Sequence, residues 1–281
     1  IIASFSERKF GANGFYALPI HVDQYEETQA SLIAFSTKIQ KEKWVFKPRV
    51  YWRRGQDMYV FVRNNPALYR NLHITHKLGA SFDASYFSSL GTTGLGIDLA
   101  RLSIDSNNLG DRERFVTTLF AEHRFQFFSN RLDITPGLSV SNYTDFGTQF
   151  FPGVDIGFAI NPAFRLYANA GYTYRIPTFT DLYYSDSTTL GNENLKAEEA
   201  ITEEIGFRWT KNRSQISMAV FNRSARNLID YIRPSAEGRF EASNIRKVNT
   251  HGFEFEAKTQ FILGNNPQLF TLGYTYLNDD V

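Results

Sequence analysis

The sequence contains no cysteine among its 281 residues. This absence excludes disulfide frameworks and thiolate metal sites, although it does not fix the cellular compartment. The sequence also has no run approaching the roughly 18 consecutive apolar residues that mark a transmembrane helix. A membrane protein of the helical kind is therefore not expected.

Positive and negative charges are balanced, because the chain has 30 Lys and Arg and 29 Asp and Glu, which gives a formal net charge of +1. Such a chain gives no reason to expect a polyanionic partner, so nucleic acid is not expected to bind.

His73 and His76 are separated by an odd offset, which on a strand sends their side chains to opposite faces. No catalytic metal and no cofactor are therefore expected.

Aromatic residues are abundant at 16%, with 26 Phe and 15 Tyr, and hydrophobic residues make up 42% of the chain. The mean hydropathy is nevertheless negative, so apolar and polar residues are finely interleaved. The stretch "RLDITPGLSVSNY" shows the pattern, because Leu132, Ile134 and Leu138 fall on one strand face and polar residues fall on the other. This alternation favours β structure.

Alternating stretches of this kind predict about thirteen strands, most of them longer than the roughly nine to eleven residues that cross a bilayer as a tilted strand. The expected strands are 1–7, 28–40, 44–62, 72–89, 92–105, 113–128, 131–146, 148–160, 164–176, 197–210, 214–232, 242–263 and 268–277. A soluble β-sandwich is the alternative, but its strands are usually about five or six residues long.

The expected connections fall into two sets. Short turns are predicted at 41–43, 129–130, 161–163, 211–213 and 264–266, and long loops at 8–27, 63–71, 106–112, 177–196 and 233–241. Short turns at one end and long loops at the other are typical of an outer-membrane barrel. The sequence therefore predicts an all-β fold, an antiparallel transmembrane β-barrel.

The stretch "ENLKAEEAITEEI" is rich in strong helix formers, so a short helix is a local alternative there. The alternation of Ile201, Ile205 and Phe207 on one face favours a strand instead.

"YTYRIPTFTDLYY", followed by "GNENLKAEEAITEEIGFRW", resembles a hallmark of TonB-dependent outer-membrane transporters. In that hallmark a strand ends in an aromatic-Arg-x-Pro-Thr-Phe-x-Asp-Leu-Tyr run, and the next loop ends in Gly-Asn-x-x-Leu-Lys-x-Glu. The later stretches "FNRSARNLIDYI" and "HGFEFEA" are similar to the two strands that follow in the family. For most of these motif residues a structural role is favoured over ligand contact.

Earlier segments resemble the cobalamin-receptor branch of that family. The matching positions include Tyr51-Trp52-Arg53-Arg54, His73, Gly79, Leu90-Gly91, Gly96, Ile104, Ser106 and Leu109-Gly110. The chain departs from the branch around "GIDLAR", where Asp98 and Ala100 stand in place of Glu and Arg. The resemblance implies cobalamin (vitamin B12) as the imported nutrient, with a ferric siderophore as the alternative.

The resemblance implies a partial barrel, about 13 strands of a 22-stranded one with the plug domain absent. Residues 1–281 are expected to be a single TonB-dependent receptor β-barrel domain, truncated at both ends. The implied partners are outer-membrane lipid, the TonB complex acting through the missing N-terminal part, the ligand, and a surface lipoprotein. No enzymatic activity is expected; a passive porin and an outer-membrane barrel enzyme are the rival functions.

Candidate ligand-binding residues are aromatic side chains in the expected long loops and two adjacent arginines. The aromatic candidates are Phe15, Tyr16, Tyr25, Tyr69, Tyr183 and Tyr184, and the arginines are Arg53 and Arg54. Loop aromatics provide a rigid amphipathic area for a large planar ligand, and guanidinium groups match carboxylate or phosphate. Self-packing of the loops and solvated charge are the alternatives.

Overall fold

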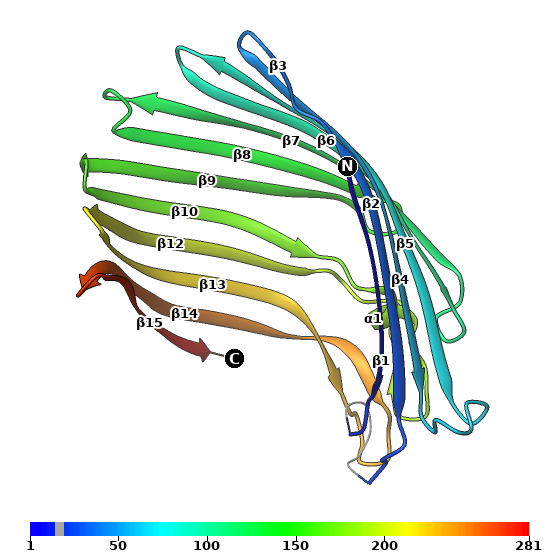
Figure 1. Cartoon of the computed structure of the whole chain (residues 1–281). Coiled ribbons are helices and arrows are strands. Elements are labelled where there is room, and N and C mark those ends of the chain that lie inside the picture. The colour runs from blue at the N-terminus through cyan, green and yellow to red at the C-terminus, as the bar shows by residue number, and fades with distance from the viewer. Residues whose placement is uncertain (15–19, 281) are drawn as a thin grey trace.

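A computed structural model describes residues 1–14 and 20–280. The described residues form a curved sheet of 15 strands, with one short helix in a connection (Figure 1). The elements are β1 (Ile2–Gly11), β2 (Tyr25–Ser36), β3 (Ile39–Lys41), β4 (Trp44–Val60), β5 (Arg70–Ser88), β6 (Gly91–Ser106), β7 (Arg112–Phe127), β8 (Leu132–Tyr143), β9 (Gly147–Asn161), β10 (Phe164–Arg175), α1 (Phe179–Tyr183), β11 (Thr189–Leu190), β12 (Glu198–Lys211), β13 (Ser214–Ile232), β14 (Phe240–Leu263) and β15 (Asn266–Asp280). Within this described part, no helix is long and apolar enough to cross a membrane.

The long strands pair antiparallel with their neighbours in sequence, in the order β1-β2-β4-β5-β6-β7-β8-β9-β10-β12-β13-β14, and β15 adds to β14. The expected all-β fold is confirmed, and each expected strand except 28–40 corresponds to one strand of the structure. In the described residues, β1 pairs only with β2 and β15 only with β14, so the sheet is open.

The expected strand 28–40 is divided into β2 and β3, and Pro48 of β4 is the reason. The N–H of Thr37 donates to the carbonyl of Pro48 at 3.2 Å. Pro48 has no N–H to return, so the ladder is interrupted there. Pairing resumes between Ile39 and Phe46, and the hairpin continues.

The stretch rich in helix formers, residues 193–205, is a strand from Glu198 onward in the structure. Residues 198–211 form β12, which pairs with β10 on one side and β13 on the other. Pairing on both sides overrides local helix propensity.

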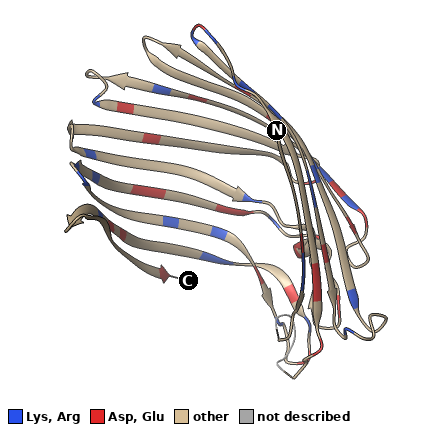
Figure 2. Cartoon of the chain, viewed as in Figure 1, with Lys and Arg blue, Asp and Glu red and all other residues tan. Residues whose placement is uncertain are grey.

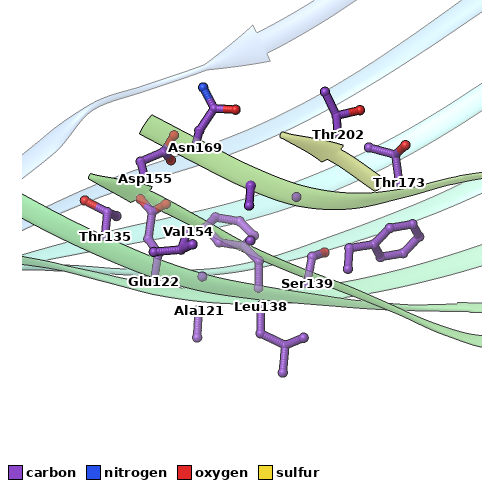
Figure 3. Close-up of a pocket in the computed structure, with 16 residues that line it drawn as sticks. Ala121, Glu122, Thr135, Leu138, Ser139, Val154, Asp155, Asn169, Thr173 and Thr202 are labelled. Carbon is purple, nitrogen blue, oxygen red and sulfur yellow. The ribbon is translucent and has the colours of Figure 1, made fainter. Parts of the chain in front are cut away.

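The sheet has one apolar and one polar face. Residues that pair across neighbouring strands lie on the same face, so each face can be followed from strand to strand. Leu138 of β8 pairs with Ala121 of β7 and is 45% exposed. Figure 3 shows both side chains pointing away from the side that carries Glu122, Asp155 and Asn169. We call the side of Leu138 the outer face and the side of Glu122 the inner face; the inner face looks toward the opposite part of the curved sheet.

The connections differ in length between the two ends of the sheet. Short turns lie at 42–43, 89–90, 128–131, 162–163, 212–213 and 264–265, and longer connections at 12–24, 61–69, 107–111, 176–197 and 233–239. The connection at 144–146, between β8 and β9, is the exception, because it is short but lies at the same end as the long ones. Asn212 and Gly264 have φ values of 54° and 63°, the left-handed backbone that tight hairpin turns require. In outer-membrane barrels the short turns face the periplasm, so the long connections mark the extracellular end.

Charged residues of both signs are interspersed along the strands (Figure 2). Several are paired between strands: Arg226 of β13 pairs with Glu199 of the neighbouring β12, and Arg165 of β10 reaches across β9 to Asp133 of β8. Interspersed charges give the sheet no large field of one sign.

Candidate functional site

Segment 177–196, which follows β10, begins in a buried polar network. Pro177 is less than 2% exposed, and its carbonyl accepts a hydrogen bond from Nη2 of Arg114 at 3.2 Å. Arg114 is 5% exposed, and its Nε donates to both carboxylate oxygens of Asp145 at 2.9 and 2.7 Å. A buried guanidinium with a carboxylate partner holds its neighbours in a fixed geometry. The point where the chain leaves the sheet is therefore firmly positioned.

Helix α1 begins immediately afterwards with a capping box. Oγ1 of Thr178 accepts from the N–H of Asp181 at 3.1 Å, and Oδ2 of Asp181 accepts from the N–H of Thr178 at 2.9 Å. The two residues satisfy each other's free amides, which starts a helix after the proline. The sequence signal for this unanticipated helix is Thr-x-x-Asp directly after Pro177.

A small apolar core holds the segment against the sheet. Leu182 and Leu195 pack with Ala242 of β14, and Phe146, Tyr183, Ile229 and Tyr231 lie around them. Asn192 Nδ2 donates to the carbonyl of Ala242 at 3.1 Å. A Cβ on Gly191 would lie 2.8 Å from the backbone of Leu182, so only glycine fits there.

Tyr184 connects the segment to the β4–β5 connection. Its hydroxyl lies 2.9 Å from the hydroxyl of Tyr69, and Nδ2 of Asn71 donates to Tyr69 at 3.0 Å and to Tyr184 at 3.3 Å. Tyr184 donates onward to Oδ2 of Asp186 at 3.0 Å. Burial raises the pKa of the Tyr184 hydroxyl most, and the hydrogen bond with Tyr69 raises it further. The hydroxyl therefore keeps its proton.

Asp186 forms a tight turn at the far side of this network. Its Oδ1 accepts from the N–H of Thr188 and the N–H of Thr189, both at 2.7 Å. Burial raises the pKa of Asp186, but the hydrogen bonds from Thr188, Thr189 and Tyr184 together outweigh it and lower the pKa below its ordinary value.

Two further connections contact the same segment. Asn108 and Ser185 form a reciprocal pair: Asn108 Nδ2 donates to the Ser185 carbonyl at 2.9 Å, and the Ser185 N–H donates to Asn108 Oδ1 at 3.2 Å. Arg239 Nη1 donates to the Asp186 carbonyl at 3.2 Å. Segment 177–196 thus ties together the β4–β5, β6–β7 and β13–β14 connections, and we call this assembly the rim platform.

Two arginines stack on tyrosine rings at this end of the sheet. Cζ of Arg112 lies 3.8 Å from the ring centroid of Tyr183, and Cζ of Arg63 lies 4.8 Å from that of Tyr25. Both arginines are exposed and both rings are half-buried. Each stack presents a flat, cationic, partly apolar surface to the exterior.

The inner face has a hollow of about 370 Å³ lower on the sheet. Its floor is a row of paired glycines, Gly137 with Gly153 and Gly153 with Gly171, where no side chains project. Polar side chains surround it, including Glu122 and Asp155 (Figure 3). This surface suits water or a polar partner rather than lipid.

The structure brings together three of the candidate ligand residues, Tyr69, Tyr183 and Tyr184, on the rim platform. Tyr69 and Tyr184 are held by hydrogen bonds within it, whereas Tyr183 stacks under Arg112. Tyr25 lies at the start of β2 beneath Arg63. The candidates Phe15 and Tyr16 lie outside the described residues.

The structure does not bring Arg53 and Arg54 together. Both lie within β4, and successive strand residues point to opposite faces. Arg53 pairs with Lys77 and belongs to the inner face, whereas Arg54 pairs with His76 on the outer face.

Sequence reasoning missed Asn71 and Asn108. Each bonds a residue far along the chain, 113 positions away for Asn71 with Tyr184 and 77 for Asn108 with Ser185. Such pairs leave no local pattern by which they could have been found.

The family model "TonB dependent receptor-like, beta-barrel" matches residues 4–281. The chain is 30% identical over 112 residues to "Vitamin B12 transporter BtuB" of Vibrio vulnificus, covering 40% of this chain and 18% of that protein. It is also 30% identical over 125 residues to "Hemoglobin and hemoglobin-haptoglobin-binding protein C" of Haemophilus influenzae, covering 39% of this chain and 11% of that protein.

Among solved structures, the siderophore receptor PirA of Pseudomonas aeruginosa superposes with a TM-score of 0.77 at 14% identity, over 92% of this chain and 51% of that chain. The FrpB iron transporter of Neisseria meningitidis gives a TM-score of 0.75 at 13% identity, over 99% of this chain and 49% of that chain. These likenesses show a shared fold, and the chain spans about half the length of either structure. The match of the family model along nearly the whole sequence identifies the chain as a member of the TonB-dependent receptor β-barrel family of the outer membrane.

Proposed function

We propose that this chain forms barrel wall and ligand-capturing rim in an active transporter that imports cobalamin across the outer membrane. The similarity to a vitamin B12 transporter supports the ligand, and the rim platform supports capture at the extracellular end. The observation that carries the proposal is the flat aromatic and guanidinium surface concentrated at the end with long connections, since a bulky planar nutrient requires rigid amphipathic area.

Within the platform the candidate residues have two different roles. Tyr183 with Arg112, and Tyr25 with Arg63, contact the ligand through their stacked surfaces. Tyr69 and Tyr184 hold the platform in place, since their hydroxyls are engaged with each other. Phe15 and Tyr16 are further candidates for ligand contact by residue type alone, and Arg53, on the inner face, meets anionic groups as the ligand enters.

The energy for import comes from the TonB complex, which acts on the plug domain of the full-length protein. A surface lipoprotein that delivers or covers the ligand is a further partner. Residues 1–281 act as a wall and a capture surface and perform no chemistry of their own.

An iron–siderophore chelate is the second candidate ligand. It is favoured by the solved structures with the same fold, which include a siderophore receptor and an iron transporter. Chelates of this type are also bulky and carry aromatic groups or charge, so the same stacked surfaces would serve them.

The test is titration of the purified full-length protein with cobalamin and, separately, with a ferric catecholate chelate. Replacing Tyr183 and Tyr184 together by Ala should weaken cobalamin binding by about 1–3 kcal/mol while barrel assembly stays intact. Tyr276→Ala, on the outer face beside Phe253, is the matched control and should leave binding unchanged. Tight binding of the iron chelate with no cobalamin binding would overturn the ligand and leave the family membership standing.

A further inference from the structure

The outer face of β4 and its neighbours shows where the lipid bilayer begins and ends. Trp44 pairs with Tyr86 near the short turns, and Trp52 pairs with Leu78 toward the extracellular end. Eight residue steps separate the two tryptophans, which is about 26 Å along a strand, or roughly 20 Å across a membrane after a 40° tilt. This is close to the apolar band of about 25 Å between the aromatic girdles of such barrels. Trp52 therefore marks the outer-leaflet boundary.

A cluster of hydrogen-bond donors lies immediately beyond this boundary. Arg54 donates from Nη1 to Oε1 of Gln29 at 3.2 Å and from Nη2 to Oε1 of Gln56 at 2.7 Å. In the described chain no carboxylate lies within salt-bridge distance of Arg54, whereas Arg101 and Arg226, also on the outer face, have glutamate partners. Arg54 is thus a half-buried cation held by neutral groups.

His76 pairs directly with Arg54 and adds a donor. Its Nδ1 accepts a hydrogen bond from Nε1 of Trp52 at 3.2 Å, and the two rings stack with centroids 5.8 Å apart. Because Nδ1 is the acceptor, Nε2 of the neutral ring carries the proton. A guanidinium and an imidazole N–H side by side match a phosphate group.

An apolar groove of about 300 Å³ lies on the bilayer side of the same strands. Its outer-face lining includes Phe35, Pro48, Val50, Ala80, Phe82 and Leu99. Val50 pairs with Ala80, whose single methyl group leaves the groove open between larger neighbours. Val50 and Arg54 are four residues apart on one face, about 13 Å along the strand. The groove therefore lies beneath the donor cluster, as an acyl chain lies beneath its headgroup.

We propose that a phosphate-bearing lipid of the outer leaflet binds at this place, with its phosphate at Arg54 and His76 and one acyl chain in the groove. Carboxylates also lie nearby on the outer face. Nζ of Lys9 neutralises Glu7 at 3.6 Å and Glu27 at 3.4 Å, and Glu113 is the ion-pair partner of Arg101. Asp105 lies on β6 opposite Ile74, one row beyond His76. The site is independent of whether cobalamin or an iron chelate is the transported ligand.

The test is native mass spectrometry of the full-length protein in detergent, titrated with bis-phosphorylated lipid A and with the same lipid after removal of its phosphates. Arg54→Gln should weaken binding of the phosphorylated lipid about tenfold, because a hydrogen bond to a charged group is lost. Arg53→Gln, one residue away on the inner face, is the matched control and should bind as the unmodified protein does. Ala80→Phe should also weaken binding by filling the groove.

Heat-modifiability on gels verifies that each variant forms a barrel, and Arg54→Lys, which keeps the charge, should retain part of the affinity. Equal binding of phosphorylated and dephosphorylated lipid would overturn the phosphate site. Equal losses in Arg54→Gln and Arg53→Gln would overturn its location. Competition by inorganic phosphate at Arg54, together with unchanged lipid binding in Ala80→Phe, would show an anion site without a lipid and would overturn the proposal.

Discussion

The hydroxyl of Tyr184 lies 2.9 Å from the hydroxyl of Tyr69, although 115 positions separate the two residues in the chain. Asn71 donates to both hydroxyls, and Tyr184 donates to Asp186. Every member of this network depends on another for a partner, so the network behaves as one unit. It fixes segment 177–196 to the β4–β5 connection and so determines the shape of the rim platform.

Tyr184→Phe in the full-length protein should destabilise the closed state of segment 177–196 by about 1 kcal/mol, because it deletes the shared hydroxyl. Hydrogen exchange of the amides of 177–196 measures the change. Tyr69→Phe should act similarly, and the double variant should cost less than the sum of the two. Strict additivity would show that the hydroxyls are not coupled.

Gly191→Ala should destabilise the platform by about 1–3 kcal/mol through overpacking. The added Cβ would lie 2.8 Å from the backbone of Leu182 and Tyr183, which has little room to move. The control is Gly171→Ala on β10, where a Cβ has no neighbour within 4 Å. Limited proteolysis measures the difference: segment 177–196 should be cleaved faster in Gly191→Ala than in Gly171→Ala. Similar cleavage rates in both variants would contradict the packing described.

Acid should loosen the platform through Asp186. Its folded-state pKa lies below the ordinary 3.8, so its contribution to stability is fully present above that pH and is lost as pH falls through the folded value. The protection of the Thr188 and Thr189 amides against hydrogen exchange, relative to the intrinsic exchange rate at each pH, should therefore fall only below about pH 4. Asp186→Asn should remove this pH dependence; a variant with the same profile as the unmodified protein would refute the assignment.

Leu138→Arg in the intact barrel should cost about 2–4 kcal/mol near the bilayer midplane, because it puts a charge on the lipid-facing side. Ser139→Arg, on the adjacent inner-face position, should be mild. Reversible unfolding from lipid vesicles measures both free energies. Equal effects would contradict the assignment of the outer and inner faces.

Residues 1–281 expressed alone should aggregate rather than form a closed barrel. Within the described residues, β1 and β15 each have one neighbour, and unpaired strand edges are unfavourable in hydrocarbon. Refolding into detergent with size-exclusion chromatography tests this expectation. A monodisperse, heat-modifiable species would indicate a smaller closed architecture.

The strands could be predicted from the sequence because their signal is local. The alternation around Leu138 predicted both the strand and the division into an apolar and a polar face, since every second residue meets the same environment. The break at Pro48 also had a local cause, a missing N–H, although alternation alone did not reveal it.

The platform could be predicted only in part. Tyr69, Tyr183 and Tyr184 were identified by residue type, but their separate roles depend on partners brought together by the fold. Arg53 and Arg54 were treated as one clamp because they are adjacent in sequence, and strand geometry separates them onto two faces. The row of glycines that forms the inner hollow arises only when β8, β9 and β10 are in register.

Uptake of labelled cobalamin by cells that produce the full-length protein tests the central claim most directly. We predict accumulation that depends on this protein, stops when the TonB complex is deleted, and falls when Tyr183 and Tyr184 are both replaced by Ala. Uptake that continues at the same rate without the TonB complex, or cells that accumulate a ferric chelate but no cobalamin, would contradict it.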